Sequence, residues 1–443
     1  MCHLYHPEWI GDIMRVLIIS SHYTPEPVIG AIRPSKLAAF LHARGHEVVI
    51  LSKSGPWEIS DGDGPEVLRT PWIRLPVFRY EDGSLKRNDL PIPTAAEQAA
   101  GNFKQRLRRL LADWSHEIFS IPDPEGGWIP FGYRAGKKAI EDSGIEVIFA
   151  TGPSFSSHII AARLARRFGV SWVADYRDLW TTGEYYMFGR MRKRIDGWIE
   201  QRVLANVACV TAIGQGLTNS LSENFPVVSH MVRNGTDEVV LAPLANRRPL
   251  SSARLNLLYV GNNFYGGRRT PKLLFRAARE MQLSPIDVKF HFLGSDPSAV
   301  DFMAREEGVL DLVEVHPSVG HMESLEWQSR ADGLLLLLWD DPRERDTISG
   351  KLFEYAAVRR SIILLGYADG EAAQIVHEHR LGWCVSEPEG STALLSDLLA
   401  KKASASLLDD LPKAYGLSRE VQHQKLENIL VESANNVMKN YNK

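Results

Sequence analysis

Short apolar runs of strand length alternate with segments of helical periodicity along almost the whole of this 443-residue chain. Consecutive parallel strands need a crossover connection, and that crossover is usually a helix. The alternation is therefore the signature of parallel sheets covered by helices. The sequence predicts an α/β fold.

The repeat falls into two halves. The two halves are separated by residues 239–254, which are rich in Pro, Ala, Asn and Arg and show no hydrophobic periodicity. This segment is interpreted as a linker. The predicted architecture is two Rossmann-like, doubly wound domains that face each other across a cleft, with ligands bound beyond the carboxyl ends of the strands. The predicted strands are 15–20, 46–52, 145–151, 171–175 and 208–212, then 255–261, 288–294, 312–318, 333–339 and 361–366.

Domain boundaries follow from the same pattern. The first domain is predicted over residues 14–238 and the second over 255–416, and a closing helix in 417–443 is expected to cross back to the first. Residues 1–13 have no signal-peptide pattern. Because Met14 directly precedes the first strand, they are interpreted as a loose extension or as the product of a start codon assigned too early.

Composition narrows the classes of function. The chain has 51 Lys and Arg against 54 Asp and Glu, a net charge of −3, which argues against nucleic acid as a partner. Its three cysteines are too few and too scattered for a disulfide framework or a zinc cage, which indicates a reducing cytoplasm. No stretch reaches the roughly 18 apolar residues that a membrane span needs. We expect a cytoplasmic protein.

The common fingerprints of this fold class are missing. Two glycine-rich stretches fall short of a dinucleotide-binding motif, the segment GPSFS lacks the last glycine of a nucleophile elbow, and neither a P-loop nor an H-E-x-x-H zinc motif occurs. A helix predicted from Pro34 ends before Gly45, so His42 and His46 are interpreted as surface histidines. No metal site and no cofactor are expected.

A predicted strand-to-helix junction in the second half has the features of a phosphate site. Ser349 and Gly350 precede a helix that begins near Lys351, so free backbone N–H groups and an ammonium would converge on one anion. Glu354, one turn further on, can accept hydrogen bonds from the two adjacent hydroxyls of a ribose. The alternative is that Lys351 and Glu354 form an ordinary surface pair.

A second junction follows the strand LNLLYVG. Gly261, Gly266 and Gly267 allow a close approach to the backbone, and Arg268 and Arg269 offer planar guanidinium groups suited to a diphosphate. The alternative is a solvated turn with exposed basic side chains. Two phosphate-like junctions at strand ends of one domain favour the functional interpretation.

The chain resembles the retaining, metal-independent, nucleotide-sugar-dependent glycosyltransferases of the GT-B architecture, specifically the large family numbered four. The resemblance spans most of the chain from Met14. It implies that the Gly30 loop approaches the donor phosphates and that Arg268 or Arg269 neutralises the diphosphate together with Lys351. It also implies that Glu354 holds the ribose. The segments that carry it are RVLIISSHYTPEPVIGAIRPSKLAAFLHARGHEVVIL, IPDPEGGWIPFG, FATGPSFSSH, ADYRDLW, VRNGTDE, LLYVGNNFYGGRR and GKLFEYAAVRRSIILLG.

The sequence departs from the family pattern at two places. The family has a glutamate eight residues before Glu354, where this chain has Asp346; either Asp346 reaches the donor sugar or that contact is missing. The commonest family form has a histidine where this chain reads Arg177-Asp178, so Asp178 is predicted to be a cleft residue. His22 and His158 are candidates to polarise the acceptor, with structural histidines as the alternative.

Residues 103–114, FKQRLRRLLADW, combine basic and apolar side chains in a way that suits an anionic membrane surface. The alternative is the solvated face of a packed helix. The membrane interpretation places the protein at the inner face of a membrane and makes a lipid-linked sugar the acceptor.

The leading hypothesis for the whole chain is a glycosyltransferase of polysaccharide or glycoconjugate synthesis. A nucleotide-sugar epimerase and a non-catalytic nucleotide or glycan binding protein stay as alternatives.

Overall fold

The computed structural model forms two compact units, each described here by itself. The first comprises Met1–Val232 with His423–Lys443, and the second comprises Arg233–Gln422. Residues 1–12, 103–114 and 240–247, the last being half of the predicted linker, lie outside the described residues. The structure describes residues 13–56, 64–73, 78–81, 84–87, 120–184, 186, 188–239, 248–264, 266–403, 411 and 413–441.

The first unit is built on a parallel sheet with the strand order β3-β2-β1-β6-β7-β8-β9. The chain runs from β1 to β2 on one side and later to β6 on the other, so the order reverses between β1 and β6. The strands are β1 (Arg15–Ile19), β2 (Glu47–Lys53), β3 (Glu66–Thr70), β6 (Val147–Gly152), β7 (Ser171–Tyr176), β8 (Cys209–Ala212) and β9 (Ser229–Met231). A separate antiparallel pair joins β4 (Phe78–Glu81) and β5 (Ser84–Arg87).

Both faces of this sheet are buried, which explains why its strands are continuous apolar runs. Leu17 and Ile19 of β1 pack with one group of helices, and Val16 and Ile18 pack on the opposite face with α1 and α14. The helices of the first group are α4 (Ile129–Ser143), α5 (Ser156–Phe168), α6 (Arg190–Leu204) and α7 (Gln215–Asn224); the others are α1 (Ile29–Ala43) and α14 (Arg419–Tyr441).

The last helix, α14, begins in the second unit and continues in the first, where Leu426 and Leu430 are part of the core. Its Glu427 is fully buried and lies 2.8 Å from His46 Nε2 and 2.8 Å from Arg44 Nε. The prediction of a surface histidine at position 46 is wrong, because this ring also accepts a hydrogen bond from the Met14 N–H and so connects β1 to α14.

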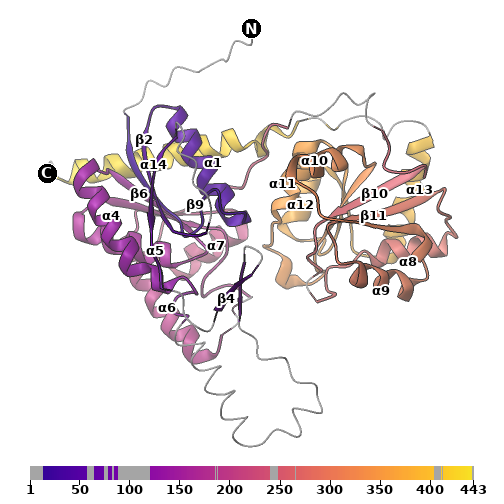
Figure 1. Cartoon of the computed structure of the whole chain (residues 1–443), viewed down its shortest axis with the longest axis horizontal. Helices are drawn as coiled ribbons and strands as arrows, with labels where there is room; N and C mark the ends of the chain where they lie inside the picture. The colour runs from indigo at the N-terminus through magenta and orange to yellow at the C-terminus, as the bar shows by residue number, and fades with distance from the viewer. Residues whose placement is uncertain are drawn as a thin grey trace, which may run out of the picture. The chain divides into compact units, whose positions relative to one another are not determined.

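The second unit repeats the plan with the strand order β12-β11-β10-β13-β14-β15. Here the order reverses between β10 and β13. One face packs on α8, α9 and α13, and the other on α10, α11 and α12 (Figure 1). The strands are β10 (Leu255–Val260), β11 (Val288–Leu293), β12 (Val313–His316), β13 (Gly333–Leu337), β14 (Ile362–Leu365) and β15 (Gly382–Val385).

Five helices of the second unit, α8 to α12, lie in the intervals between these strands, and α13 follows the last strand. They are α8 (Lys272–Glu280), α9 (Pro297–Glu307), α10 (His321–Arg330), α11 (Gly350–Val358), α12 (Glu371–Glu378) and α13 (Pro388–Ala403). The predicted α/β class with two Rossmann-like sheets is confirmed.

Candidate functional site

Arg177, which directly follows β7, joins three segments at the carboxyl ends of the first sheet. Its Nε donates to the Gly152 carbonyl at 2.9 Å, Nη1 donates to the Gly30 carbonyl at 2.9 Å, and Nη2 donates to the Pro153 carbonyl. Gly152 ends β6, and the strand order reverses between β1 and β6. Ligands of open α/β sheets bind at such reversal points.

Gly30 lies in the first turn of α1 and not in a loop, because the helix begins at Ile29, before the predicted start near Pro34. Pro34 has no N–H to donate to the carbonyl four residues earlier, which is that of Gly30. The carbonyl is therefore available to Arg177. His22 also lies beside Gly30, where an added Cβ would be 3.5 Å from the histidine Cδ2.

A buried ion pair fixes α1 against β7. Asp175 accepts hydrogen bonds from Arg33 Nε at 2.9 Å and Arg33 Nη2 at 2.7 Å, and from the hydroxyls of Thr151 and Thr211. Burial acts to raise the pKa of Asp175, but the Arg33 charge and these hydrogen bonds outweigh it, so the pKa is lowered. The same guanidinium donates to the Val232 carbonyl at 3.0 Å.

A titratable cluster, formed by His22, Glu26, Lys53 and Glu125, surrounds the ends of β1 and β2. His22 Nδ1 lies 2.9 Å from Glu26 Oε2, and its Nε2 lies 3.7 Å from Glu125 Oε1. Lys53 is fully buried, with Nζ 3.2 Å from Glu125 Oε1 and 3.9 Å from Glu26 Oε1. Paired carboxylates beside a histidine can orient a hydroxyl and take up its proton.

Asp123 lies next to this cluster and accepts hydrogen bonds from the Ser156 N–H and hydroxyl. Burial, reinforced by the neighbouring charge of Glu125, raises the pKa of Asp123 to about 7. Perturbed carboxyl groups at strand ends are frequent in active sites. Glu26, Lys53, Asp123 and Glu125 were not predicted as site residues, although a lysine at the end of a buried strand, as Lys53 is, is a signal that the sequence contains.

His158 and Asp178, the other two predicted acceptor-side residues, have opposite surroundings. His158 is fully buried, stacks on Tyr176 with 4.9 Å between ring centroids, and has its pKa lowered to about 4 by burial. It is a core residue because the third position of α5 faces the sheet. Asp178 is exposed, directly after Arg177.

In the second unit, Lys351 lies against the end of β10. A side chain at Gly261 would overlap Lys351 Nζ, and this Nζ stands 4.7 Å from the centroid of the Tyr259 ring. Burial, opposed by the charge of Glu354 and assisted by that of Arg269, lowers the pKa of Lys351 to about 8. Lys351 is the second residue of α11, whose N-cap is Ser349, followed by an exposed Gly350.

Arg268 and Arg269 point to different partners. Arg269 Nη2 donates to both carboxylate oxygens of the buried Glu344, at 2.9 and 3.0 Å, which holds it near Lys351. Arg268 is exposed and stacks on Trp339 at 4.5 Å, and Arg343 lies over the same ring at 4.1 Å. Of these two arginines, Arg269 is the one that contacts Glu344, beside Lys351.

Glu354 is oriented by α10. Its Oε1 accepts a hydrogen bond of 2.6 Å from the buried Gln328, and Oε2 lies 3.8 Å from His321 Nδ1. Asp346 is half-buried in the segment before α11. The structure therefore brings Gly261, Arg269, Lys351 and Glu354 together at the strand ends of one unit.

The family comparison agrees with part of the sequence-based resemblance. Residues 31–235 match the model of the glycosyl transferase 4-like domain, and the resemblance is confirmed for this part of the chain. No curated protein matches the chain by sequence.

Three solved structures of sugar-transferring enzymes have a similar fold at low sequence identity. A glycosyltransferase from Rickettsia africae has a TM-score of 0.57 and 12% identity, with 96% of this chain and 99% of that chain covered. Sucrose-phosphate synthase from Thermosynechococcus elongatus has a TM-score of 0.54 and 16% identity, over 97% and 98%. The catalytic domain of starch synthase IV from Arabidopsis thaliana, bound to ADP and acarbose, has a TM-score of 0.53 and 12% identity, over 96% and 100%.

These neighbours show the GT-B fold, and the domain match together with that fold supports glycosyl transfer as the activity. Within the described part of the chain, none of the helices combines the length and the apolar character needed to traverse a bilayer.

Proposed function

We propose that this chain, whose residues 31–235 match a glycosyl transferase 4-like domain, is a retaining glycosyltransferase that uses a nucleoside-diphosphate sugar. The acceptor is a carbohydrate or a lipid-linked sugar, the transferred group is a hexose or an N-acetylhexosamine, and the product is a surface polysaccharide or glycoconjugate. The observation that carries the proposal is the grouping of Gly261, Arg269 and Lys351 at the start of α11.

The proposed chemistry at these residues is stabilisation of a departing diphosphate. As the bond from the anomeric carbon to the phosphate oxygen breaks, negative charge grows on that oxygen. The charges of Lys351 and Arg269 and the backbone amides at the start of α11 stabilise this negative charge. The acceptor hydroxyl attacks the same face of the sugar and gives its proton to the departing phosphate oxygen, so configuration is retained. We propose that these cations, rather than a divalent metal, neutralise the diphosphate, and that turnover is unchanged by added Mg²⁺.

Glu354 is proposed to accept the two ribose hydroxyls. Gln328 occupies one of its oxygens, and a carboxylate has further acceptor positions for the ribose. Asp346 is the proposed contact to the donor sugar, and Asp346→Ala tests it, since an unchanged KM for the donor would remove that contact. Starch synthase IV, which shares the fold, holds ADP and acarbose, which supports a nucleotide site in this architecture.

The cluster around His22 is the proposed acceptor site of the first unit, with Asp178 exposed nearby. Its charged groups stand at the strand ends where the order reverses, the position that binds ligands in such sheets. Because His158 is fully buried, we assign the acceptor role to His22 alone of the two histidines.

Peripheral contact with a membrane is proposed for α6. Met191, Ile195 and Trp198, spaced along one face of this helix, are 72%, 42% and 56% exposed. The neighbouring side chains Arg190, Lys193 and Arg194 are exposed and basic. Apolar side chains framed by cations suit an anionic bilayer surface.

A hollow of about 640 Å³ adjoins this helix. It is lined by Pro130, Tyr133, Arg134, Arg163, Arg166 and Arg167. Arg166 donates to the backbone carbonyl of Arg202 in the last turn of α6, so the basic hollow borders the end of that helix. We propose that this combined surface meets lipid phosphates and gives access to a lipid-linked acceptor.

The experiment that tests the function is a screen of nucleoside-diphosphate sugars by thermal shift, followed by product analysis with the donor that binds. A ligand of the folded state raises the Tm, and Lys351→Ala should abolish the rise. Slow release of nucleoside diphosphate without acceptor supports the transferase. Interconversion of the sugars would instead establish an epimerase, and binding without turnover would establish a binding protein.

A further inference from the structure

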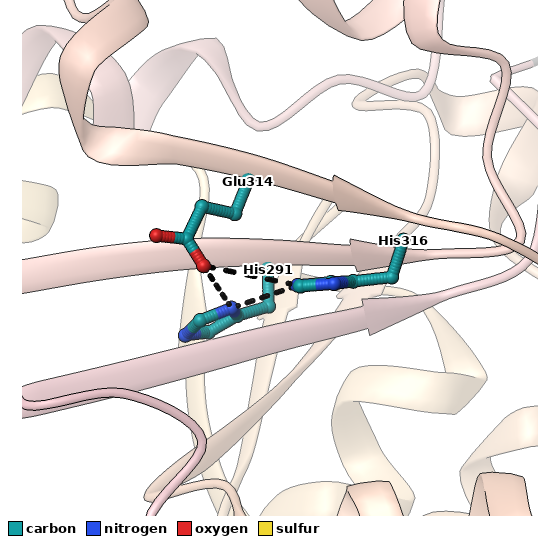
Figure 2. A group of neighbouring side chains, drawn as sticks. All are labelled: His291, Glu314 and His316. Carbon is teal, nitrogen blue, oxygen red and sulfur yellow. Dashed lines mark hydrogen bonds and ion pairs between the residues drawn. The ribbon is translucent and has the colours of Figure 1, made fainter.

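Three potential metal ligands meet on the sheet of the second unit, and none of them is among the residues proposed to hold the donor. His291 lies on β11, and Glu314 and His316 lie on the neighbouring strand β12 (Figure 2). His291 is directly opposite Glu314 in the strand register, and His316 is two residues further along β12. Residues two apart on a strand point to the same face, so the three side chains converge.

The distances within this group match the requirements of one small cation. His291 Nδ1 is 3.1 Å from His316 Nε2 and 3.5 Å from Glu314 Oε2, and the latter two atoms are 4.0 Å apart. The nearest point equidistant from these three atoms lies in their plane, about 2.1 Å from each, within the usual range for zinc bonded to histidine nitrogen and carboxylate oxygen. A small shift of the partly exposed Glu314 side chain towards the histidines would let the ion move out of this plane towards a fourth ligand.

Hydrogen bonds to neighbouring residues set the tautomer of His291. Asn256 Nδ2 donates to the Ala253 carbonyl at 3.1 Å, and Asn256 Oδ1 accepts from the Ser251 hydroxyl, so Oδ1 is an acceptor. His291 Nε2 lies 3.0 Å from this Oδ1 and must donate to it. Its Nδ1 therefore carries the lone pair that faces Glu314 and His316. Histidine ligands of metals usually donate their other ring N–H to an oxygen in this way.

The other two side chains are also held in place. Lys289 Nζ lies 3.1 Å from Glu314 Oε1, which leaves Oε2 directed at the histidines. The ring of Trp327 on α10 lies 4.5 Å from that of His316, between centroids. The Glu314 and His316 side chains are 39% and 22% exposed, so a water molecule can reach a fourth coordination position.

We propose that His291, Glu314 and His316 bind one Zn²⁺ ion, with water as the fourth ligand. Two imidazoles and a carboxylate form a set that zinc accepts in tetrahedral geometry. The ion would join the edge strand β12 to β11 just before the chain enters α10, the helix that orients Glu354. Its role would be to stabilise the second unit, and the inference does not depend on the proposed transferase activity.

The test is zinc binding by the full-length, chelator-stripped and tag-free protein, measured by equilibrium dialysis and by the visible absorption of Co²⁺ as a zinc substitute. The parent protein should bind about one ion per chain, with the strong absorption of tetrahedral cobalt, and zinc should raise its Tm. His316→Gln and Glu314→Gln should lose the site. Both substituted side chains are partly exposed in the parent protein, and circular dichroism checks that the two variants fold.

His377→Ala is the matched control, because His377 is an exposed histidine of the same unit. It should keep the zinc stoichiometry, the cobalt spectrum and the Tm response. The proposal is overturned if the parent protein binds no more zinc than His316→Gln, or if His377→Ala loses as much zinc as His316→Gln does.

Discussion

Replacing Gly261 by alanine should remove Lys351 from the proposed diphosphate site without removing its charge from the chain. Gly261 has φ +107°, and an added Cβ would overlap Lys351 Nζ. Because Nζ is the end of a flexible side chain, the lysine would move away and the fold would persist. Holding alanine in such a backbone conformation costs about 1–3 kcal/mol of stability.

The loss in affinity can be estimated from the interaction that is displaced. A hydrogen bond to a charged group contributes about 1.5–3 kcal/mol, which corresponds to about a 10- to 140-fold rise in Kd for a nucleoside diphosphate. Isothermal titration calorimetry with UDP, GDP and ADP measures it directly, with whichever nucleotide the parent protein binds.

Gly308→Ala is the control for backbone strain in the same unit. Gly308 has φ +71° at the end of α9, and the nearest atom to an added Cβ there is 3.9 Å away, on Arg279. This variant should lose stability but keep the parent Kd. If both variants weaken nucleotide binding equally, or if Gly261→Ala binds like the parent protein, Lys351 does not hold the diphosphate.

Three further outcomes are expected. Because the pKa of Lys351 is lowered to about 8, its side chain is charged below that pH and neutral above it, so the affinity for the nucleotide should fall between pH 7 and 9. Lys351→Arg keeps the charge over this range, and calorimetry should show a nearly constant affinity. Asp175→Asn would leave Arg33 buried without its counter-charge and should cost about 3–5 kcal/mol in urea unfolding; a loss below about 1 kcal/mol would contradict that account. Trp198→Ala should weaken sedimentation with anionic vesicles, and added salt should weaken the sedimentation of the parent protein. Phe302→Ala, which removes a similarly exposed side chain from α9, should sediment like the parent protein; equal sedimentation of the two variants would reject the α6 surface.

The sequence was informative where the relevant residues are close together along the chain. The start of α11 was predicted correctly from capping and helix-dipole arguments, because its N-cap Ser349 and the residues Lys351 and Glu354 of its first turns are close in sequence. The strands could also be predicted from local sequence, because a strand that is buried on both faces is a continuous apolar run.

Contacts between distant segments could not be predicted in this way. Glu125 meets Lys53 across 72 positions, and the two carboxylates beside His22 come from different loops. His46 pairs with Glu427 across 381 positions, so no local pattern distinguished it from a surface histidine. The same limit applies to His291 and His316, which become neighbours only through the pairing of β11 with β12.

Pro34 shows how a hydrogen bond that a helix lacks can be used to attach another segment of the chain. A proline here deprives one peptide oxygen of its intrahelical donor, and a guanidinium from another strand takes that place. An alanine at position 34 would restore the missing amide and compete for the same lone pairs. The helix would then be more regular, but Arg177 would be held less firmly. The turn after β6 would lose its connection through Arg177 to α1.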